Sequence, residues 1–505
     1  MMKKRTSRRG LYAPCFYFMK RLLVWVLFLG SCTYTVPEGR KTNSLPEVFP
    51  DYAGVTIPPN IAPLNFALAT EHTEAYAVFQ ADGRTLTVKE NGGGQFRIPE
   101  RKWRELVHSS AGQSITVTVY AKEAGERVMY DPFLLHIAAE PVDPYIAYRL
   151  IEPGYELWHH MGIYQRNLES FAESAIMENK MSGENCMNCH SFCMQNPDKM
   201  LFHMRGVNQG TILIDGDRIE KLNTKADGAV SAFVYPSWHP SGRYVAFSVN
   251  ETRQAFHQND RNRVEVFDLQ SDVLVYDVEK HEAVTTDRLF SKEAFETFPT
   301  FSPDGRMLYF CSAAARDMPK DFKEIRYSLC AISFDSETRG FGSRTDTLYN
   351  AETEGKSVTF PRVSPDGKHL LYTLSDYGNF PVWHTEADLY MIDLSTDEHH
   401  PLEQANSAGA TDSYHSWSSN SRWIVFGSRR TDGLYTRPYI AYIDTAGNSA
   451  KPFLLPQKDT EFYARFLKSY NIPEFITGKV RQQGRKIGLT AKEEKGIDVG
   501  KLIIR

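Results

Sequence analysis

Two fourteen-residue segments, FPTFSPDGRMLYFC (298–311) and FPRVSPDGKHLLYT (360–373), decide the fold of this chain. Two further segments align with them, YPSWHPSGRYVAFS (235–248) and YHSWSSNSRWIVFG (414–427). Their marker residues lie 63, 62 and 54 residues apart: Trp238, Phe301, Val363 and Trp417. Each repeat predicts a strand, a tight turn and a strong second strand. Self-similarity at this period indicates an architecture built from repeated units.

A third strand is predicted after each repeat, in VLVYDV (273–278), SLCAIS (328–333), LYMIDL (389–394) and YIAYID (439–444). Units of this size, each a small antiparallel sheet, build β-propellers. The S-P-D-G turn with its flanking aromatic residues resembles the repeats of TolB-like propellers, which are relatives of the WD repeat. That resemblance covers about half of the chain and implies an all-β fold. We expect a propeller over 146–475 with about five blades, or six.

The fifth blade is expected to begin with IAYRL (146–150) and GIYQR (162–166) and to be completed by TILIDGDRIEKL (211–222). The stretch 167–205 would then be a short helical insertion between strands of one blade. The segment FYARFLKSYNIPEF (462–475) is expected to close or cap the ring. Residues 476–505 are predicted to be a basic, loosely ordered tail.

Inside the expected insertion, Cys186, Cys189 and His190 form C-x-x-C-H, the attachment sequence of c-type haem. Two thiols at this spacing can bond the two vinyl groups of one porphyrin, and the adjacent histidine then becomes the proximal iron ligand. The motif therefore predicts one covalent haem c. A loop on a rigid scaffold is a usual place for a functional group.

The second axial ligand of such a haem is predicted to be His203, thirteen residues after His190 and just past a Pro-Asp turn. Met200 is the alternative ligand, because either residue type can hold haem iron. The remaining candidates are Met194, Met204 and the cluster His159, His160 and Met161. By contrast, His239 and His415 fall inside blade repeats and are expected to be structural.

Other interpretations of the cysteines stay open. The pair Cys186 and Cys189 could be a redox dithiol or a structural disulfide. It could also hold zinc, with Cys193 and His203 as third and fourth ligands. On consecutive predicted strands, Cys311 and Cys330 could form a cross-strand disulfide or remain two buried thiols.

The first 31 residues have the features of an export signal, with a basic start at Lys20 and Arg21 followed by the apolar run LLVWVLFL (22–29). Eight residues are too few to span a bilayer, which takes about 20. The run ends in Leu-Gly-Ser-Cys, which resembles the lipobox of bacterial lipoproteins. That resemblance implies a lipidated Cys32 and a protein anchored in the bacterial cell envelope, at the outer membrane facing the periplasm.

After this anchor, the proline-rich stretch 32–63 is predicted to be an extended tether. Residues 64–140 then alternate apolar and polar side chains over five runs, broken by Asp82-Gly83 and Gly92-Gly93-Gly94. One helical stretch, PERKWRELV (99–107), interrupts them. We expect an immunoglobulin-like β-sandwich that serves as a spacer or binding module.

The chain has 505 residues and a formal net charge of −4, which argues against binding to nucleic acid. It contains no G-x-S-x-G elbow, Walker loop, Rossmann fingerprint or H-E-x-x-H helix, so an enzyme is not expected unless a haem is the catalyst. The leading hypothesis is electron transfer or redox sensing with an unidentified envelope partner. The alternatives are a non-haem binding scaffold with a structural C-x-x-C, and a haem-dependent oxidase or peroxidase.

Overall fold

The computed structural model describes residues 39–152, 160–481 and 483–505. The signal segment and Cys32 therefore lie outside the described residues. Strands dominate, and the described residues belong to one compact unit. Among the described residues, no helix is both long and apolar enough to cross a bilayer.

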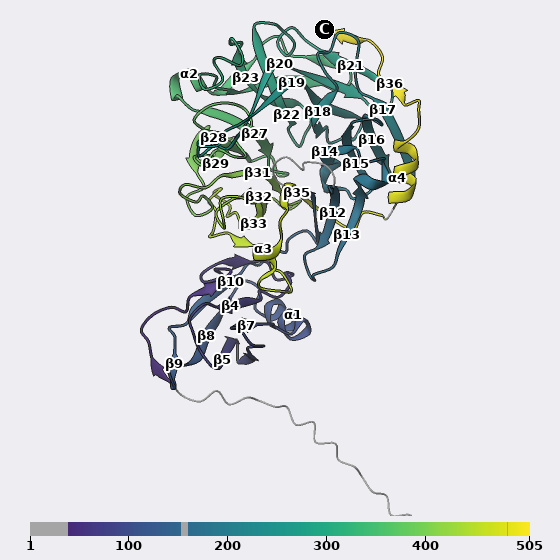
Figure 1. Ribbon diagram of the computed structural model, residues 1–505. Coiled ribbons are helices and arrows are strands. Elements are labelled where there is room, and N and C mark those ends of the chain that lie inside the picture. The colour runs from purple at the N-terminus through teal and green to yellow at the C-terminus, as the bar shows by residue number, and fades with distance from the viewer. Residues whose placement is uncertain (1–38, 153–159, 482) are drawn as a thin grey trace, which may run out of the picture. The chain divides into compact units, whose positions relative to one another are not determined.

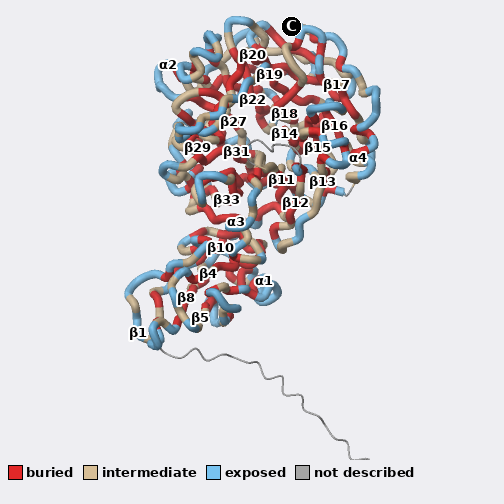
Figure 2. The backbone as a smooth tube through the Cα atoms, in the orientation of Figure 1, coloured by how far each residue is buried: buried red, intermediate tan, exposed pale blue. Residues whose placement is uncertain are grey.

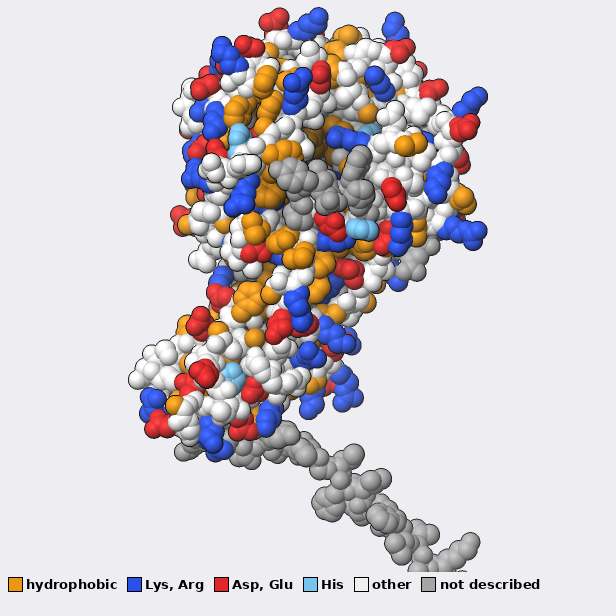
Figure 3. Space-filling view, in the orientation of Figure 1, with side chains coloured by type: hydrophobic (Ala, Val, Ile, Leu, Met, Phe, Trp, Pro, Cys, Tyr) orange, Lys and Arg blue, Asp and Glu red, His pale blue; other side chains and the backbone are white. Residues whose placement is uncertain are grey.

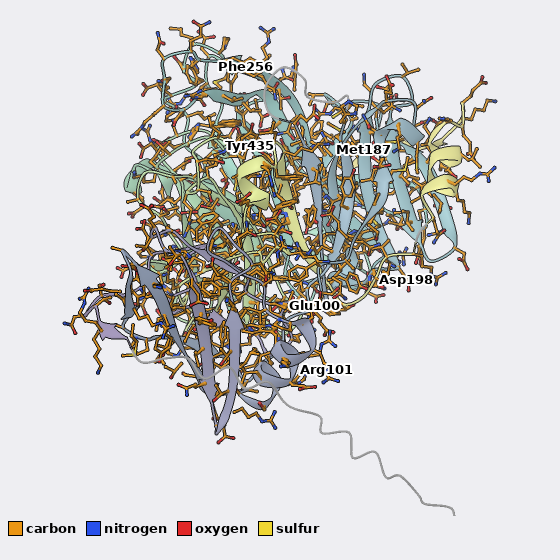
Figure 4. All side chains as sticks on the ribbon, turned by 60° about the horizontal axis from the view of Figure 1, so that its bottom comes forward. Glu100, Arg101, Met187, Asp198, Phe256 and Tyr435 are labelled. Atoms are coloured by element: carbon orange, nitrogen blue, oxygen red, sulfur yellow. The ribbon has the colours of Figure 1, made fainter. Side chains whose placement is uncertain are left out.

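The N-terminal region consists of two sheets and one helix. The larger sheet contains β1 (Arg40–Lys41), β3 (Thr56–Ile57), β5 (Ala75–Ala81), β6 (Arg84–Lys89), β8 (Ser114–Glu123), β9 (Glu126–Met129) and β10 (Phe133–Ile137). The smaller sheet contains β2 (Val48–Phe49), β4 (Phe66–Leu68) and β7 (Gln95–Phe96). The helix α1 (Glu100–Ser109) buries Trp103, Leu106 and Val107, spaced to share one face, and leaves Glu100 and Arg101 exposed (Figure 4).

The expected tether is part of this region rather than a spacer where it is described. Residues 39–63 supply β1, β2 and β3, and Tyr52, Val55 and Ile57 are almost completely buried in its core. The Tyr52 hydroxyl also donates a hydrogen bond of 3.2 Å to the Leu454 carbonyl. Prolines restrict the chain to extended conformations, but they do not prevent the apolar residues between them from packing.

Six small, mostly antiparallel sheets follow, consistent with propeller blades. Blade 1 is β35 (Ser469–Ile476), β11 (Tyr145–Ile151), β12 (Gly162–Asn167) and β13 (Glu173–Glu178). Blade 2 is β14 (Cys186–Phe192), β15 (Lys199–Arg205), β16 (Gly210–Asp215), β17 (Arg218–Asn223) and β36 (Ile497–Asp498). Blade 3 is β18 (Phe233–Trp238), β19 (Tyr244–Phe256), β20 (Val264–Asp277), β21 (Glu282–Thr285) and β37 (Leu502–Ile504).

The other three blades contain the remaining repeats. Blade 4 is β22 (Ala294–Phe301), β23 (Met307–Ala314) and β24 (Ser328–Asp335), with β25 (Gly340–Phe341) and β26 (Asp346–Tyr349) both paired to β24. Blade 5 is β27 (Ser357–Val363), β28 (His369–Ser375), β29 (Asp388–Asp393) and β30 (Glu398–Pro401). Blade 6 is β31 (Asp412–Trp417), β32 (Trp423–Ser428), β33 (Arg437–Tyr442) and β34 (Phe453–Leu454). Short helices lie outside the sheets: α2 (Ala351–Glu354), α3 (Phe462–Arg465), α4 (Gly484–Ala491), η1 (Asn179–Met181) and η2 (Cys193–Gln195).

The first strands of the blades contact one another in a closed cycle, from β14 through β18, β22, β27 and β31 to β35 and back to β14. Figure 1 shows the blades following one another around this ring in chain order. The strand β35 comes from the C-terminal region but pairs with β11, so the two ends of the ring are joined within blade 1. The ring begins at Tyr145 and ends at Ile476, close to the expected limits of 146 and 475.

All six inner strands share one irregularity. In each, two residues of the inner strand lie opposite one residue of the neighbouring strand, which defines a β-bulge. The same bulge position has a positive φ between 49° and 53° in each blade, at Cys189, Tyr235, Phe298, Phe360, Tyr414 and Ile472. This shared geometry aligns β14 with the other five inner strands, residue by residue.

The expected insertion at 167–205 is therefore wrong as a description of the chain. That stretch contains the last strand of blade 1, a short connection, and the first two strands of blade 2. The segment with the C-x-x-C-H motif is not helical. It is extended because β15 and the adjacent blades pair with it and pack against it (Figure 4 labels Met187 on this strand).

The C-terminal segment is ordered where it is described, in contrast to the loose tail that was expected. The helix α4 buries Ile487, while β36 and β37 pair in parallel with the outer strands β17 and β21. Figure 2 shows buried residues concentrated in the strands of the ring, with exposed residues in the connecting turns. On the face drawn in Figure 3, charged side chains of both signs are interspersed.

Candidate functional site at the mouth of the ring

The motif residues Cys189 and His190 lie on the inner strand of blade 2, at the bulge and the position after it. At the position of Cys189, four other blades carry Tyr or Phe and blade 1 carries Ile472. Neighbouring aromatic rings pack directly, with centroids 4.4 Å apart for Tyr235 and Phe298 and 4.6 Å apart for Phe360 and Tyr414. Cys189 thus fills one position in a belt of six mostly apolar residues.

Both thiols of the motif are free, and that of Cys189 is buried in the belt. Burial raises the pKa of Cys189, which suppresses the thiolate form needed for nucleophilic attack. Cys186 is half-buried, and none of the five cysteines in the described chain forms a disulfide. Cys311 and Cys330 remain separate because they sit one position out of register in the β23–β24 pair and belong to different core clusters.

His190 follows the bulge and lines a cavity at the mouth of the ring. Its side chain is 2% exposed, and burial lowers its pKa to about 3, so the imidazole is neutral. The nearby Ile472 backbone opposes this shift in pKa, but among the described residues neither ring nitrogen has a partner within strict hydrogen-bond geometry. Orphaned polar atoms in a buried position are rare and call for an explanation.

The corresponding residue of blade 6, His415, provides a comparison within the same ring. Its Nε2 contacts the Leu371 carbonyl at 3.1 Å and its Nδ1 contacts the Thr373 hydroxyl at 3.5 Å. The other four blades have proline at this position: Pro236, Pro299, Pro361 and Pro473. Of the two histidines at this position, only His190 has polar atoms that the protein leaves unused.

Of the candidate distal ligands, Met194 lines the same cavity as His190, whereas the two preferred candidates, His203 and Met200, do not. His203 is buried on β15, where its Nδ1 lies 3.1 Å from the Thr211 hydroxyl. Met200 is completely buried in the apolar cluster of Met161, Phe192 and Ile214. Neither residue lines the mouth cavity, and Met161, which belongs to the other candidate cluster, accepts a hydrogen bond from the Met187 N–H at 3.1 Å. His159 lies outside the described residues.

The geometry of this segment does not fit a covalent haem. On a helix, residues three and four apart share a face, so two thiols and a histidine can serve one porphyrin; along a strand, successive side chains alternate. The cavity beside His190 has a volume of about 120 Å³, below the roughly 300–1,000 Å³ of sites for drug-sized ligands. A zinc site is not supported either, because the described residues contain no group of three or more ligands.

The residue after His190 and the corresponding residues of the other five blades form a second ring of six side chains. These are Ser191, Ser237, Thr300, Arg362, Ser416 and Glu474, and all of them line the mouth cavity. Two hydroxyl groups of this ring make hydrogen bonds between adjacent blades. Ser237 accepts from the Phe301 N–H at 3.2 Å, and Ser416 donates to the Pro473 carbonyl at 2.9 Å. The charged members of this ring, Arg362 and Glu474, were not identified from the sequence, although they occupy the aligned position of the repeat.

Comparisons with known proteins leave the family open. No family model and no curated protein matches this chain. Among solved structures, a puromycin hydrolase is similar at 14% identity and a TM-score of 0.36, over 61% of this chain and 45% of that one. Prolyl oligopeptidase B from Galerina marginata has 14% identity and a TM-score of 0.34, over 59% and 41%. The tricorn protease has 10% identity and a TM-score of 0.33, over 78% and 43%. The chain therefore spans less than half the length of these three proteins.

Proposed function

We propose that this protein is a non-haem binding scaffold of the bacterial cell envelope, in which C-x-x-C-H is part of a blade. The observation that supports this most is the shared bulge, where Cys189 takes the position of Tyr235, Phe298, Phe360 and Tyr414. A residue with this structural role explains the motif without a cofactor. The mouth of the ring, where six blades contribute polar side chains, is the proposed binding surface.

Electron transfer through a covalent haem c remains the second candidate. One observation favours it: a buried histidine without partners lies beside two free cysteines. A haem at this position would require β14 to leave the blade, because its residues are paired with β15 from Cys186 to Phe192. If it bound there, His190 would be the axial ligand and the two thiols would hold the porphyrin.

Expression with a c-type maturation system separates these two functions. We expect purified protein to carry no haem that survives denaturing electrophoresis, while a control cytochrome from the same host does. We also expect Cys186→Ser and Cys189→Ser to unfold cooperatively in urea, within about 1–3 kcal/mol of the wild type, since each replaces one small side chain. Cys311→Ser, which alters a completely buried thiol in blade 4, is the matched control. Covalent haem that is lost from the two motif variants, but not from the control, would refute the scaffold.

The envelope location rests on the lipobox-like end of the signal segment. We expect Cys32→Ala to move the protein from the membrane fraction to the soluble periplasmic fraction, because the variant cannot carry acyl chains at that cysteine. Fractionation followed by immunoblotting measures this change. The control is Cys193→Ala, whose thiol is buried in the ring. A Cys32→Ala protein that stays with membranes would refute the proposed anchor.

A further inference from the structure

The mouth cavity contains two opposite charges that do not neutralise each other. Arg362 lies on blade 5 and Glu474 on blade 1, and the inner strand of blade 6 separates them. Each influences the pKa of the other, but no ion pair joins them in the described part of the chain. Both residues are partly buried, so water screens the two charges less than it would at the surface, and a ligand that pairs with both of them would be favoured.

The Arg362 guanidinium makes few hydrogen bonds within the described part of the protein. Within the described ranges its one hydrogen bond goes from Nη1 to the neighbouring Pro361 carbonyl at 3.3 Å, which leaves most of its donors available. Burial lowers the pKa of Arg362, yet arginine stays protonated in proteins. A planar guanidinium with free donors suits a carboxylate, which it can bind through two parallel hydrogen bonds.

One of the two carboxylate oxygens of Glu474 has a hydrogen-bond partner among the described residues, and the other does not. Its Oε1 accepts the Phe192 N–H at 3.2 Å, the same link between adjacent blades that Ser237 makes with Phe301. Its Oε2 is buried and has no hydrogen-bond partner among the residues that the structure describes. Serine would satisfy the structural link, so the second carboxylate oxygen is available for a donor group of a ligand. Burial raises the pKa of Glu474 to about 7, and a cation beside it would favour its ionised form.

His190 gives the independent indication that a ligand belongs here. It is almost completely buried, it lines the same cavity, and neither ring nitrogen is satisfied, unlike those of His415. As a neutral imidazole it offers one donor and one acceptor. Met194, which is 43% exposed, also lines this cavity. At about 120 Å³ it is slightly smaller than an engineered cavity of about 150 Å³ that binds benzene.

We propose that the mouth of the ring binds a small zwitterion of the α-amino acid class, with its carboxylate on Arg362 and its ammonium group on Glu474. His190 supplies a further polar contact to the ligand. This inference rests on the proposed scaffold function and names the ligand of its mouth. A dianion such as phosphate would meet repulsion from Glu474, and a plain cation would meet repulsion from Arg362, whereas a zwitterion satisfies both charges.

The test is calorimetric titration of the purified full chain at pH 8, where Glu474 is ionised, with glycine, acetate and methylammonium. Glycine is expected to bind at least about tenfold more tightly than either single-charge fragment, because it makes both charge-assisted contacts. L-tryptophan is expected not to compete, since its side chain exceeds the cavity. Glycine that binds no better than both fragments would overturn the proposal.

Two variants probe the two charges. Arg362→Met and Glu474→Gln should each weaken glycine binding by about tenfold or more. The glutamine keeps an acceptor oxygen for the Phe192 N–H. Arg344→Gln, which removes a cation that is 83% exposed on blade 4, should bind glycine like the wild type. Unchanged affinity in a folded Arg362→Met protein would refute the site, and if both variants fail to fold, the fragment comparison on wild type decides.

The two proposals fail in different ways. Covalent haem on the wild-type protein would refute the scaffold function, whether or not the protein binds glycine. If the protein carries no haem and does not bind glycine, the proposed ligand site is refuted and the scaffold function is not.

Discussion

A chain that ends at Lys468 is expected not to form the ring, whereas a chain that ends at Gly478 is expected to fold. The ten residues between these two ends contain β35, which pairs with β11 and lies between β31 and β14. Tyr470, Phe475 and Ile476 are at most 1% exposed. Burying a large apolar side chain contributes about 1.5–3 kcal/mol, and typical domains have only about 5–15 kcal/mol of stability in total.

The chain that ends at Gly478 serves as the control, because it lacks α4, β36 and β37 but keeps β35 and therefore a closed ring. It should lose part of its stability, since Ile487 and Leu502 are buried in the full chain. Urea unfolding followed by circular dichroism distinguishes the two proteins. If the chain ending at Lys468 unfolds as cooperatively as the chain ending at Gly478, β35 does not close the ring.

Arg437→Met is expected to destabilise the protein by about 3 kcal/mol or more, because it removes three hydrogen bonds from one buried charged donor, each worth about 1.5–3 kcal/mol. Arg437 is completely buried at the start of β33. Its guanidinium donates to the carbonyls of Lys468, Phe466 and Tyr463 at 2.8, 2.8 and 3.0 Å. These carbonyls belong to the segment that leads into β35, so the arginine holds the closing strand in place.

The matched control is Arg465→Met, in the same segment. Arg465 is 62% exposed and pairs with Glu461 at 3.3 Å, and exposed ion pairs contribute about 0–1 kcal/mol. Equilibrium urea denaturation of both variants gives the comparison. A loss for Arg437→Met that is no larger than the loss for Arg465→Met would show that the carbonyl contacts do not stabilise the ring.

Much of the fold could be read from the repeats, because turn chemistry and alternation act locally. The segments 298–311 and 360–373 contain the S-P-D-G turn and two strands of apolar residues, and both form the first two strands of a blade. The sixth repeat was missed because NCHSFCMQNPDKMLFHM (188–204) lacks the glycine of the turn and has Cys189 where most other copies have an aromatic residue. The N-P-D turn followed by the apolar residues MLF is the pattern from which this repeat could have been predicted.

By itself, the sequence determined the alternation of strands and turns and the position of the repeats, since these depend on neighbouring residues. It also provided a C-x-x-C-H motif, whose chemistry depends on which side chains share a face. Only the tertiary structure decided that face, because β15 and the adjacent blades hold Cys186–Phe192 as a strand. Ring closure likewise brought Arg362, His190 and Glu474 to one cavity from positions 284 residues apart at the extremes (474 − 190). No local pattern encodes that proximity, because it arises from six blades packing around a common axis.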